Sequence, residues 1–492
     1  MRVLIFHGYL LRGTGSNVYN AQLAAALARL GHEVHLLCQD RDPPPLPGVE
    51  IHVPDIGRVL PVYVADRYEG FEAKPYPELS DAELEHYLAA NVAAVGEVAE
   101  GVRPDVALAN HLVMGPAILA RGLGGGVPYA IKIHGSALEY TVKPHPARFL
   151  PYAREGLAGA SGVLVGSRHT AESLWAALGD PALPERTRLG PPGVDVASFV
   201  PREHASLDAL VARLRARGGR QEQGSFAFDD REAAAALERV RVGEDRVVAY
   251  VGKLIVSKGI DLLLAAWPLV LERVPAGRLV VVGFGAYRET CETLIAALAA
   301  GDLARVRDVA RQGRGAEGGE AAPLRMLEAF LDGLEADPAA RERYLAAAAA
   351  MADRVVLTGR LEHAELAAFL PACEALVVPS TFPEAFGMVA AEAAACGVLP
   401  VSADHSGLAE VSGALAAQAP PEAGAWLSFP LSDRAVEDLA ERLTGWLDAP
   451  ADLRARTQSA LVATARERWS WEGVATGVIA AAQGRLGDLP SP

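Results

Sequence analysis

Short apolar runs alternate with alanine-rich stretches through the first half of the chain. The runs that predict β-strands lie at residues 3–6, 33–37, 106–109, 129–133 and 163–165. Residues 18–30 have the length and composition of a helix, which Gly31 ends. Strands that alternate with helices in this way are typical of a parallel sheet with helices on both faces.

The same alternation restarts after about residue 240. Here the predicted strands lie at residues 247–251, 279–282, 355–357, 375–378 and 399–401. A helix is predicted at 261–273, and a helical stretch at 453–483 has Trp469 and Trp471 as anchors. We therefore predict an α/β protein with two doubly wound units in tandem.

Two segments interrupt this pattern. Residues 201–240 are charged and contain a glycine-rich run at 218–224. A second glycine-rich run at 311–319 lies within a longer interruption near 300–350. We interpret both as loop-like insertions at the surface, where added length costs little stability. Either could shape a ligand-binding site or a subunit contact, and the sequence leaves the oligomeric state open.

Composition narrows the functional class. The chain has 492 residues, of which 51% are hydrophobic and 22% charged, so it can bury large cores. Lys and Arg number 46 against 61 Asp and Glu, which gives a net charge of −15. An acidic surface repels nucleic acid and anionic membranes, so we expect no nucleic-acid partner. A local basic site for a small anion remains compatible with this balance.

Cysteines and apolar runs predict the compartment. The four cysteines (Cys38, Cys291, Cys373 and Cys396) are far apart and form no disulfide framework. The apolar run at residues 3–6 is too short for a signal peptide, and no run of about 18 apolar residues predicts a transmembrane segment. We expect a cytoplasmic protein, with peripheral membrane contact left open.

The most informative segment spans residues 377–392. A predicted strand ends at Pro379, the loop after it carries Glu384, and Gly387 starts a helix of small residues. Unpaired amides at such a helix start favour a phosphate group. Glu384 and Glu392 could contact opposite ends of one ligand; alternatively, they are a helix-start acid and a solvated acid. A glutamate inside an apolar helix is costly unless it has a partner.

Two lysines occupy the loop after the first strand of the second unit. Lys253 and Lys258 lie between a strand and a helix, where they can converge on a diphosphate without a metal ion. The alternative is that they are surface lysines of a loop. Because ligands of α/β sheets bind at the carboxyl ends of strands, their position favours a functional role.

Together these residues resemble the retaining glycosyltransferases called group 1 or family 4, which have the two-domain GT-B fold. Glu384 and Glu392, with seven residues between them, match the family's glutamate pair, and the two lysines match its basic pair. Further matches are Gly13-Thr14-Gly15, His134-Gly135, Pro192-Gly193-Val194-Asp195 and Trp469-Ser470-Trp471. The departures are Lys253, where the family usually has arginine, and Ser406-Gly407, which replaces a glycine pair.

The resemblance implies two Rossmann-like domains that face across a cleft. Residues 1–195 would bind the acceptor, with a C-terminal helix at 466–492 packing back onto them, and residues 196–465 would bind the donor. The reaction would move a hexosyl group to a hydroxyl with retained anomeric configuration. A nucleoside-diphosphate sugar would be the co-substrate, and no cofactor or metal would be required.

The roles of individual residues follow from the same resemblance. Glu384 would bind hydroxyls of the donor sugar and Glu392 the ribose, while Lys253 and Lys258 would neutralise the leaving diphosphate. His134 would contact the donor sugar near the reacting centre. The backbone amides that border the diphosphate and sugar would be those of Phe386, Gly387, Met388 and Val389. The segment flanking the nucleotide base would be Gly359, Arg360 and Leu361. The acceptor or phosphate loop would comprise Gly13, Thr14, Gly15, Ser16 and Asn17.

Two motifs resemble metal-binding sites, but we do not interpret either of them as one. Asp40-Arg41-Asp42 has the D-x-D spacing used by metal-dependent glycosyltransferases of another fold, but it precedes a run of three prolines and fits a polar loop. His32 and His35 have the wrong spacing for a zinc-binding helix and lie at a predicted strand. We therefore expect no metal-ligating residues.

Two other functions are compatible with the same features. A nucleotide-sugar isomerase of the 2-epimerase type also uses paired Rossmann-like units, and a non-catalytic nucleotide-sugar binder would share the donor residues. The spacing of the two glutamates and of the two lysines favours transfer. The donor base, the donor sugar and the acceptor are left open.

Overall fold

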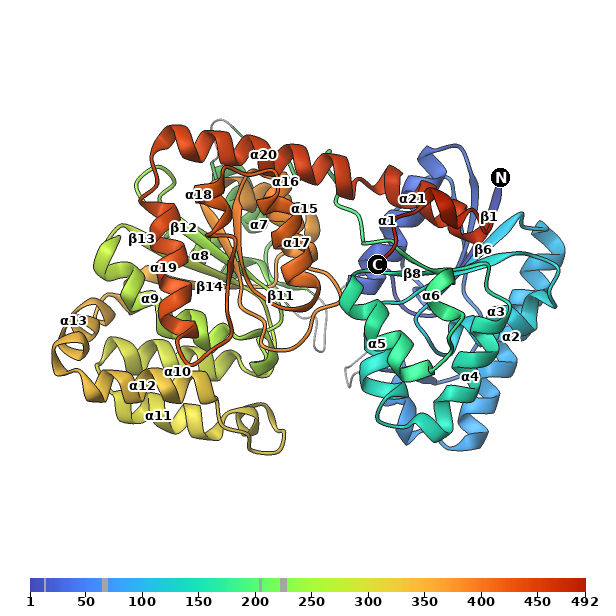
Figure 1. The fold of residues 1–492 in the computed structure, drawn as a ribbon, viewed down its shortest axis with the longest axis horizontal. Coiled ribbons are helices and arrows are strands. Elements are labelled where there is room, and N and C mark those ends of the chain that lie inside the picture. Colours follow the sequence, from blue (N-terminus) through green and yellow to red (C-terminus); the bar gives the residue numbers. More distant parts are fainter. Residues whose placement is uncertain (13–14, 64–69, 203–205, 222–227) are drawn as a thin grey trace. The chain divides into compact units, whose positions relative to one another are not determined.

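The computed structural model describes residues 1–12, 15–63, 70–202, 206–221 and 228–492. The chain divides into two compact units. Unit 1 comprises residues 1–195 and 468–492, and unit 2 comprises residues 196–467. Each unit is built on a parallel β-sheet with helices packed against it (Figure 1).

The sheet of unit 1 has seven strands in the order β3-β2-β1-β6-β7-β8-β9. Every neighbouring pair in it is parallel. The strands are β1 (Arg2–Phe6), β2 (Glu33–Leu37), β3 (Val49–His52), β6 (Val106–Asn110), β7 (Tyr129–Lys132), β8 (Gly162–Val165) and β9 (Thr187–Leu189). The strand order reverses between β1 and β6, which makes their carboxyl ends the switch point where doubly wound sheets bind ligands.

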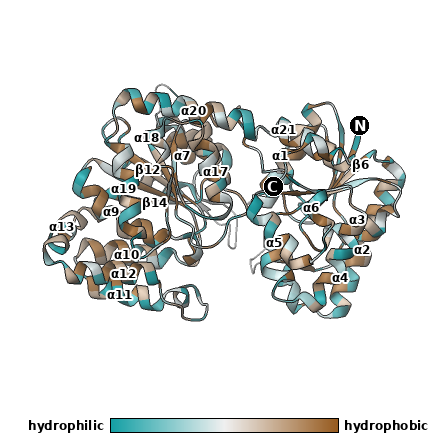
Figure 2. Cartoon of the chain, in the orientation of Figure 1, coloured by the Kyte–Doolittle hydropathy of each residue, from teal (hydrophilic) through white to brown (hydrophobic). Residues whose placement is uncertain are grey.

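Helices cover both faces of this sheet. One face packs against α1 (Gly15–Arg29) and α21 (Trp471–Ala482). The other packs against α2 (Asp81–Val102), α3 (Gly115–Leu123), α4 (Pro146–Ala158) and α5 (Arg168–Leu178). Unit 1 also contains the short helix α6 (Leu183–Arg186) and the parallel strand pair β4 (Val59–Val62) and β5 (Glu72–Pro75). The helices alternate hydrophobic and hydrophilic residues, as Figure 2 shows, because only one side of each faces the core.

The C-terminal residues belong to unit 1 through a contact between two motifs. The Val194 N–H donates a hydrogen bond of 2.6 Å to Trp469 O. A Cβ atom at Gly193 would lie 2.5 Å from the Trp471 indole, so only glycine fits there. The stretch predicted to be helical at 453–483 forms two helices, α20 (Ala451–Trp469) and α21, which Ser470 separates.

Unit 2 holds a six-stranded parallel sheet in the order β14-β13-β12-β15-β16-β17. Its strands are β12 (Arg246–Val251), β13 (Gly277–Val282), β14 (Val355–Gly359), β15 (Ala375–Val378), β16 (Leu399–Ala403) and β17 (Ser428–Phe429). Its main helices are α9 (Ile260–Arg273), α10 (Arg288–Ala299), α15 (His363–Phe369), α16 (Met388–Ala395), α17 (Ser406–Ala416) and α19 (Ala435–Leu447). The short helices α14 (Met351–Arg354) and α18 (Pro421–Gly424) complete it. The predicted class, α/β with two doubly wound sheets, is confirmed.

The prediction that residues 201–240 are loop-like is wrong for much of that segment. It contains α7 (Asp208–Arg217), α8 (Asp230–Leu237) and the strand pair β10 (Arg220–Gln221) and β11 (Phe228–Asp229). The Arg217 guanidinium lies 2.5 Å from Asp230 and 2.6 Å from Glu365, both of which are buried. The pair with Asp230 joins α7 to α8 within the segment, and the pair with Glu365 attaches the segment to the rest of unit 2.

The interruption near 300–350 is also mostly helical. It comprises α11 (Leu303–Gln312), α12 (Arg325–Ala336) and α13 (Pro338–Ala348), which lie together in Figure 1. The glycine-rich run between α11 and α12 folds back on itself, because Arg314 N–H donates to Ala322 O.

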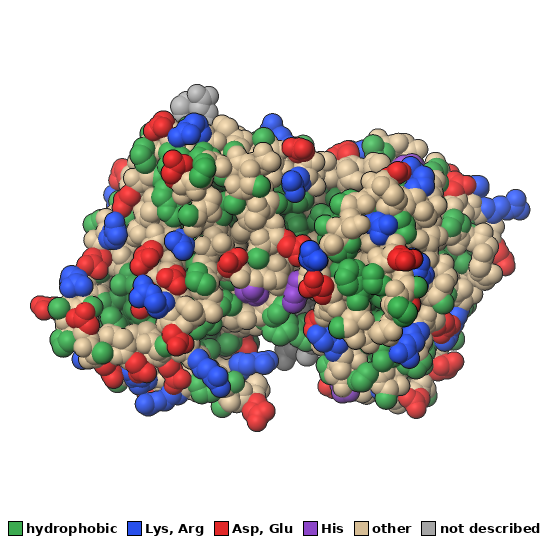
Figure 3. Space-filling model, in the orientation of Figure 1, with side chains coloured by type: hydrophobic (Ala, Val, Ile, Leu, Met, Phe, Trp, Pro, Cys, Tyr) green, Lys and Arg blue, Asp and Glu red, His purple; other side chains and the backbone are tan. Residues whose placement is uncertain are grey.

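The surface in view carries both signs of charge. Acidic and basic side chains are interspersed over each unit in Figure 3. Among the residues that the structure describes, none of the helices is both long enough and apolar enough to cross a bilayer.

Candidate active site

Two loops meet at the switch point of unit 2. The first follows β12 and contains Lys253 and Lys258; the second follows β15 and contains Glu384. Gly259 has a φ of +65°, and a Cβ atom there would lie 1.9 Å from Pro379 O. Thr381 N–H donates a hydrogen bond of 3.0 Å to Ser257 O. Glycine and this hydrogen bond therefore hold the lysine loop against the glutamate loop.

Lys258 and Glu384 form an ion pair where these loops meet. Ser380 Oγ donates a hydrogen bond of 2.6 Å to Glu384 Oε1. Burial alone would raise the pKa of Glu384, but the Lys258 ammonium and the Ser380 hydroxyl outweigh it and lower that pKa. Glu384 is therefore ionised at neutral pH and can accept hydrogen bonds from ligand hydroxyls.

A third loop, after β16, fixes the backbone of Glu384. Ser406 Oγ accepts a hydrogen bond of 2.9 Å from Glu384 N–H, and Gly407 N–H donates one of 3.0 Å to Glu384 O. A Cβ atom at Gly407 would lie 2.7 Å from the backbone of Phe386, so glycine is required there. Ser406 has a φ of +52°, the left-handed conformation that a glycine would adopt without strain. The departure from a glycine pair thus keeps the backbone shape and adds a hydroxyl.

His405 links this third loop to the glutamate loop. Its Nε2 lies 2.7 Å from Ser380 O, and its Nδ1 lies 3.1 Å from Ser406 Oγ. A neutral imidazole satisfies both contacts, because Nε2–H donates to the carbonyl and Nδ1 accepts from the serine hydroxyl. Sequence reasoning missed Ser380 and His405. Their position at the carboxyl ends of β15 and β16 was the available signal.

Helix α16 begins immediately after the glutamate loop, as predicted. Gly387 precedes it, and a Cβ atom at Gly387 would lie 2.8 Å from Leu408 Cδ2. The first hydrogen bond of the helix runs from Ala390 N–H to Gly387 O, so the amides of Met388 and Val389 precede the regular bonding. Phe386 is buried beneath this turn. The first turn can therefore offer backbone donors to a phosphate.

Glu392 lies inside α16 and is 4% exposed. Its Oε1 is 3.8 Å from His363 Nδ1. Burial raises the pKa of Glu392 to about 8. This carboxyl group is therefore largely protonated at neutral pH without a ligand, in contrast to the ionised Glu384.

The raised pKa of Glu392 predicts how stability depends on pH. The unfolded chain holds this group near its ordinary pKa of 4.5, so the folded state binds the proton more tightly. Its contribution to the free energy of unfolding therefore falls as the pH rises from about 4.5 to about 8. Glu392→Gln should raise the melting temperature at pH 9 and change it little at pH 5. Melting curves of the ligand-free protein at both pH values test this, and an equal shift at both would contradict it.

Lys253 lies against an aromatic ring. Its Nζ is 5.9 Å from the centroid of the Phe284 ring, and the Arg360 guanidinium is 6.0 Å from the same centroid. Phe284 follows β13, and the backbone around it is held by Leu254 N–H, which donates to Phe284 O at 2.7 Å. Lys253 thus contacts Phe284, whereas Lys258 contacts Glu384. Phe284 was not among the residues predicted for the site.

The predicted base-flanking segment follows β14, next to the Phe284 turn. Gly359 has a φ of +73°, and its O accepts a hydrogen bond of 2.9 Å from Gly283 N–H. Arg360 is buried and lies 2.7 Å from Glu362, and Leu361 is also buried. The guanidinium therefore faces protein groups, and contact with a nucleotide base remains a prediction for this segment.

The interruption near 300–350 reaches the lysine loop. Glu317 Oε2 accepts a hydrogen bond of 3.0 Å from Val256 N–H. Val256 starts the short 3₁₀ turn that ends at Lys258. This glutamate therefore helps to fix the turn that presents Lys258, a role that its glycine-rich surroundings did not indicate.

The switch point of unit 1 holds a chain of polar side chains. His134 Nε2 lies 2.8 Å from Asn110 Oδ1, and Asn110 Nδ2 donates to Asn20 Oδ1 at 2.7 Å. Asn20 Nδ2 lies 3.0 Å from His7 Nδ1, and His7 Nε2 lies 3.0 Å from Asn17 Oδ1. All four hydrogen bonds can form at once if each residue donates to the next, from His134 to Asn17. This arrangement places the proton on Nε2 of both imidazoles. His134 therefore sits in the unit without Glu384, linked to the start of α1.

Histidines and tyrosines surround this chain. The rings of His111, Tyr9, Tyr63 and His134 pack on one another with centroids 4.6 to 5.7 Å apart. Burial is the main cause that lowers the pKa values of His134 and His111 well below the ordinary range, and burial lowers that of His7 to about 4. These histidines are therefore uncharged at neutral pH. His7 and His111 were missed, although each follows a predicted strand.

The predicted glycine loop is described only in part. Gly13 and Thr14 lie outside the described residues, whereas Gly15 and Ser16 form the first residues of α1. Asp40 Oδ2 accepts a hydrogen bond of 3.0 Å from Leu11 N–H, just before this loop. Asp40 of the D-x-D motif therefore stabilises the backbone of unit 1 at Leu11 through this hydrogen bond.

This fold and site define a class. Sucrose-phosphate synthase from Thermosynechococcus elongatus superimposes with a TM-score of 0.59 at 20% identity, covering 99% of both chains. A likeness at this identity shows the fold, which is that of GT-B glycosyltransferases. The two doubly wound parallel sheets therefore give the protein the GT-B fold.

The family follows from sequence comparison. Residues 13–198 match the model of Glycosyltransferase Family 4, and residues 333–461 match that of Glycosyl transferases group 1. The chain belongs to this group 1 and family 4 glycosyltransferase family.

Two curated relatives are similar over different lengths. A D-inositol 3-phosphate glycosyltransferase of Segniliparus rotundus is 26% identical over 495 aligned positions, covering 96% of this chain and 85% of the relative. A GDP-mannose-dependent alpha-(1-6)-phosphatidylinositol monomannoside mannosyltransferase of Mycobacterium tuberculosis is 35% identical over 152 residues, 30% of this chain and 38% of the relative. Both relatives are transferases rather than isomerases.

Proposed function

We propose that this enzyme transfers a hexosyl group from a nucleoside-diphosphate sugar to an acceptor hydroxyl, with retention and without a metal ion. The observation that carries the proposal is the ion pair of Lys258 with Glu384 beside the start of α16. Lys258 and the amides of Met388 and Val389 would hold the diphosphate, and Glu384 would accept from sugar hydroxyls. Unit 2 is thus the donor side.

The reaction breaks the bond from the anomeric carbon to the phosphate oxygen and forms one to the acceptor oxygen. The acceptor proton would pass to the departing phosphate oxygen on the same face of the sugar. The protein then contributes position and charge, because Lys258 offsets the negative charge that grows on the leaving group. Retention and this proton path rest on the resemblance to the retaining family.

We further propose an inositol-bearing acceptor bound by unit 1. The names of both curated relatives contain an inositol compound, D-inositol 3-phosphate in one and phosphatidylinositol monomannoside in the other. We place this acceptor beside the packed rings of His111, Tyr9 and Tyr63, which lie at the switch point of unit 1. A cytoplasmic location is proposed from the four cysteines, each of which is free and buried.

One experiment separates transfer from its alternatives. Melting temperatures with UDP, GDP and ADP and with their sugars identify the donor, because a ligand of the folded state raises stability. The preferred donor is then incubated with and without inositol or inositol 3-phosphate. Two results support the proposal. Nucleoside diphosphate is released only when the acceptor is present, and the NMR coupling of the product's anomeric centre shows the same configuration as in the donor. A new nucleotide sugar without acceptor indicates an isomerase, and tight binding without release indicates a binder.

Metal independence gives a separate prediction. Transfer should survive excess EDTA within about twofold, because Lys258 and the first turn of α16 supply the positive charge. Asp42→Asn, a change at an exposed residue of the D-x-D motif, should keep normal turnover. Initial rates with EDTA and after addition of Mg²⁺ or Mn²⁺ measure this. Loss of transfer on chelation followed by rescue would contradict the prediction.

A further inference from the structure

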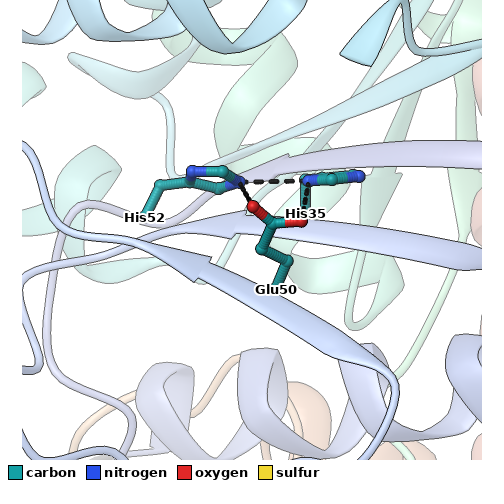
Figure 4. Close-up of side chains that lie close together, drawn as sticks. All are labelled: His35, Glu50 and His52. Carbon is teal, nitrogen blue, oxygen red and sulfur yellow. Dashed lines mark hydrogen bonds and ion pairs between the residues drawn. The ribbon is translucent and has the colours of Figure 1, made fainter. Parts of the chain in front are cut away.

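An edge of the unit 1 sheet brings three potential metal ligands together. Strands β2 and β3 are parallel neighbours whose register pairs His35 with Glu50 and Leu37 with His52. Because side chains two apart on a strand share a face, Glu50 and His52 lie on the face that carries His35. Figure 4 shows these three side chains pointing toward one another across the two strands.

The distances fit a metal site. His35 Nδ1 lies 3.1 Å from His52 Nε2 and 3.5 Å from Glu50 Oε2, and His52 Nε2 lies 3.9 Å from Glu50 Oε1. Tetrahedral zinc with bonds of about 2.0–2.1 Å has ligand atoms about 3.3 Å apart. The two histidine nitrogens are therefore spaced like ligands of one zinc ion, and each lies within 4 Å of one of the two Glu50 carboxylate oxygens. Among the described residues, this is the one group of three such side chains with ligand atoms this close.

A fourth residue orients His35 from behind. His35 Nε2 lies 3.2 Å from Glu33 Oε1, a contact in which Nε2–H donates to the carboxylate. The lone pair of Nδ1 is then directed to His52 and Glu50. A carboxylate that accepts from the outer nitrogen of a metal-bound histidine is the usual support of such a ligand. This contact distinguishes the group from a chance cluster of surface acids.

The positions of the ring protons on His35 and His52 are also compatible with a bound metal ion. With Nδ1 of His35 as acceptor, the short contact between the rings requires Nε2–H on His52. Zn²⁺ would take the place of this proton at Nε2, and the neutral imidazole of His52 would then carry its proton on Nδ1. His35 is 3% exposed whereas Glu50 is exposed, so an ion can enter from the surface while one ligand is held rigidly.

We propose that His35, Glu50 and His52 form a binding site for one Zn²⁺ ion, completed by water. The ion would tie the edge strand β3 to β2. Cys38 N–H donates to His52 O, and Gln39 N–H donates to Tyr9 O, so the site also supports the loop before α1. This role is structural and independent of the donor diphosphate.

The sequence did not predict this site. His35 was considered with His32, a pair with no metal-binding spacing, and His52 lies seventeen positions further along. Strand β3 was not among the predicted strands. The site exists only because β3 pairs in parallel with β2 in the observed register.

Zinc content tests the proposal directly. Full-length protein without an affinity tag is treated with a chelator, dialysed against ZnCl₂ and freed of excess ion, and bound zinc is measured by elemental analysis. We expect about one Zn²⁺ per chain, reduced to background in His52→Gln. Glu33→Gln should weaken zinc binding by about 10–100-fold. His86→Gln, at an exposed histidine of α2, is the matched control and should bind like the wild type.

Thermal melting adds a second readout. Zinc should raise the melting temperature of the wild type and of His86→Gln but not that of His52→Gln or Glu50→Gln. Melting without zinc checks that the variants fold. Absence of retained zinc in the wild type, or equal retention in His52→Gln, would overturn the proposal. Turnover is measured separately below the melting temperature, so the transfer proposal and the zinc proposal can fail independently.

Discussion

Replacing Glu384 with glutamine is expected to lower the rate of glycosyl transfer by about 10²-fold or more while the protein remains folded. The carboxylate is ionised because Lys258 and Ser380 lower its pKa despite burial. Glutamine keeps the size of the side chain but loses the negative charge. Hydrogen bonds from sugar hydroxyls then weaken, and Lys258 loses its partner.

Turnover at saturating donor and donor affinity must both be measured for this variant. Glu422→Gln in α18 changes an exposed glutamate in the same way and should leave both unchanged. Glu392→Gln should chiefly weaken donor binding, because the resemblance gives that residue a contact with the ribose. Near-normal turnover of Glu384→Gln would remove Glu384 from the proposed site.

Much of the fold could be predicted because the central strands of parallel sheets are buried on both faces. Such strands are continuous apolar runs, as at 247–251 and 375–378, and need no partner to be recognised. Edge and short strands are different. Val49–His52 alternates apolar and polar residues over only four positions, and Ser428–Phe429 has two residues. Their pairing depends on neighbours that the local sequence does not contain.

The candidate site could be predicted where its functional groups are close together along the chain. The loop with Glu384 and the start of α16 are adjacent along the chain, so their association was expected. The contact of Lys258 with Glu384 joins residues 126 positions apart, and it depends on Gly259 packing against Pro379. His405 and Glu317 were missed because each acts through hydrogen bonds from a different loop.

Lysine 258 should matter more than lysine 253. We expect Lys258→Ala to lower turnover by about 10²–10³-fold, the usual effect of removing a group that stabilises charge in the transition state. Lys253→Ala should have a smaller effect, because its ammonium lies against the Phe284 ring. The structure adds a reason, since the Lys258 ammonium also lowers the pKa of Glu384. Lys258→Ala therefore removes the positive charge beside the leaving group, and it also lowers the fraction of Glu384 that is ionised.

The pH profile separates these two effects. Burial raises the pKa of Glu384, and Lys258 is one of the groups that lower it. Without Lys258 this pKa rises, so a smaller fraction of Glu384 is ionised at neutral pH. The residual turnover of Lys258→Ala should therefore increase from pH 6 to pH 9 more steeply than that of the wild type. Lys253→Ala keeps the Lys258–Glu384 ion pair and should follow the wild-type profile. Turnover at saturating donor across this range is the measurement. Losses of less than about threefold in both variants would contradict the assignment, because a group that offsets transition-state charge contributes more than that.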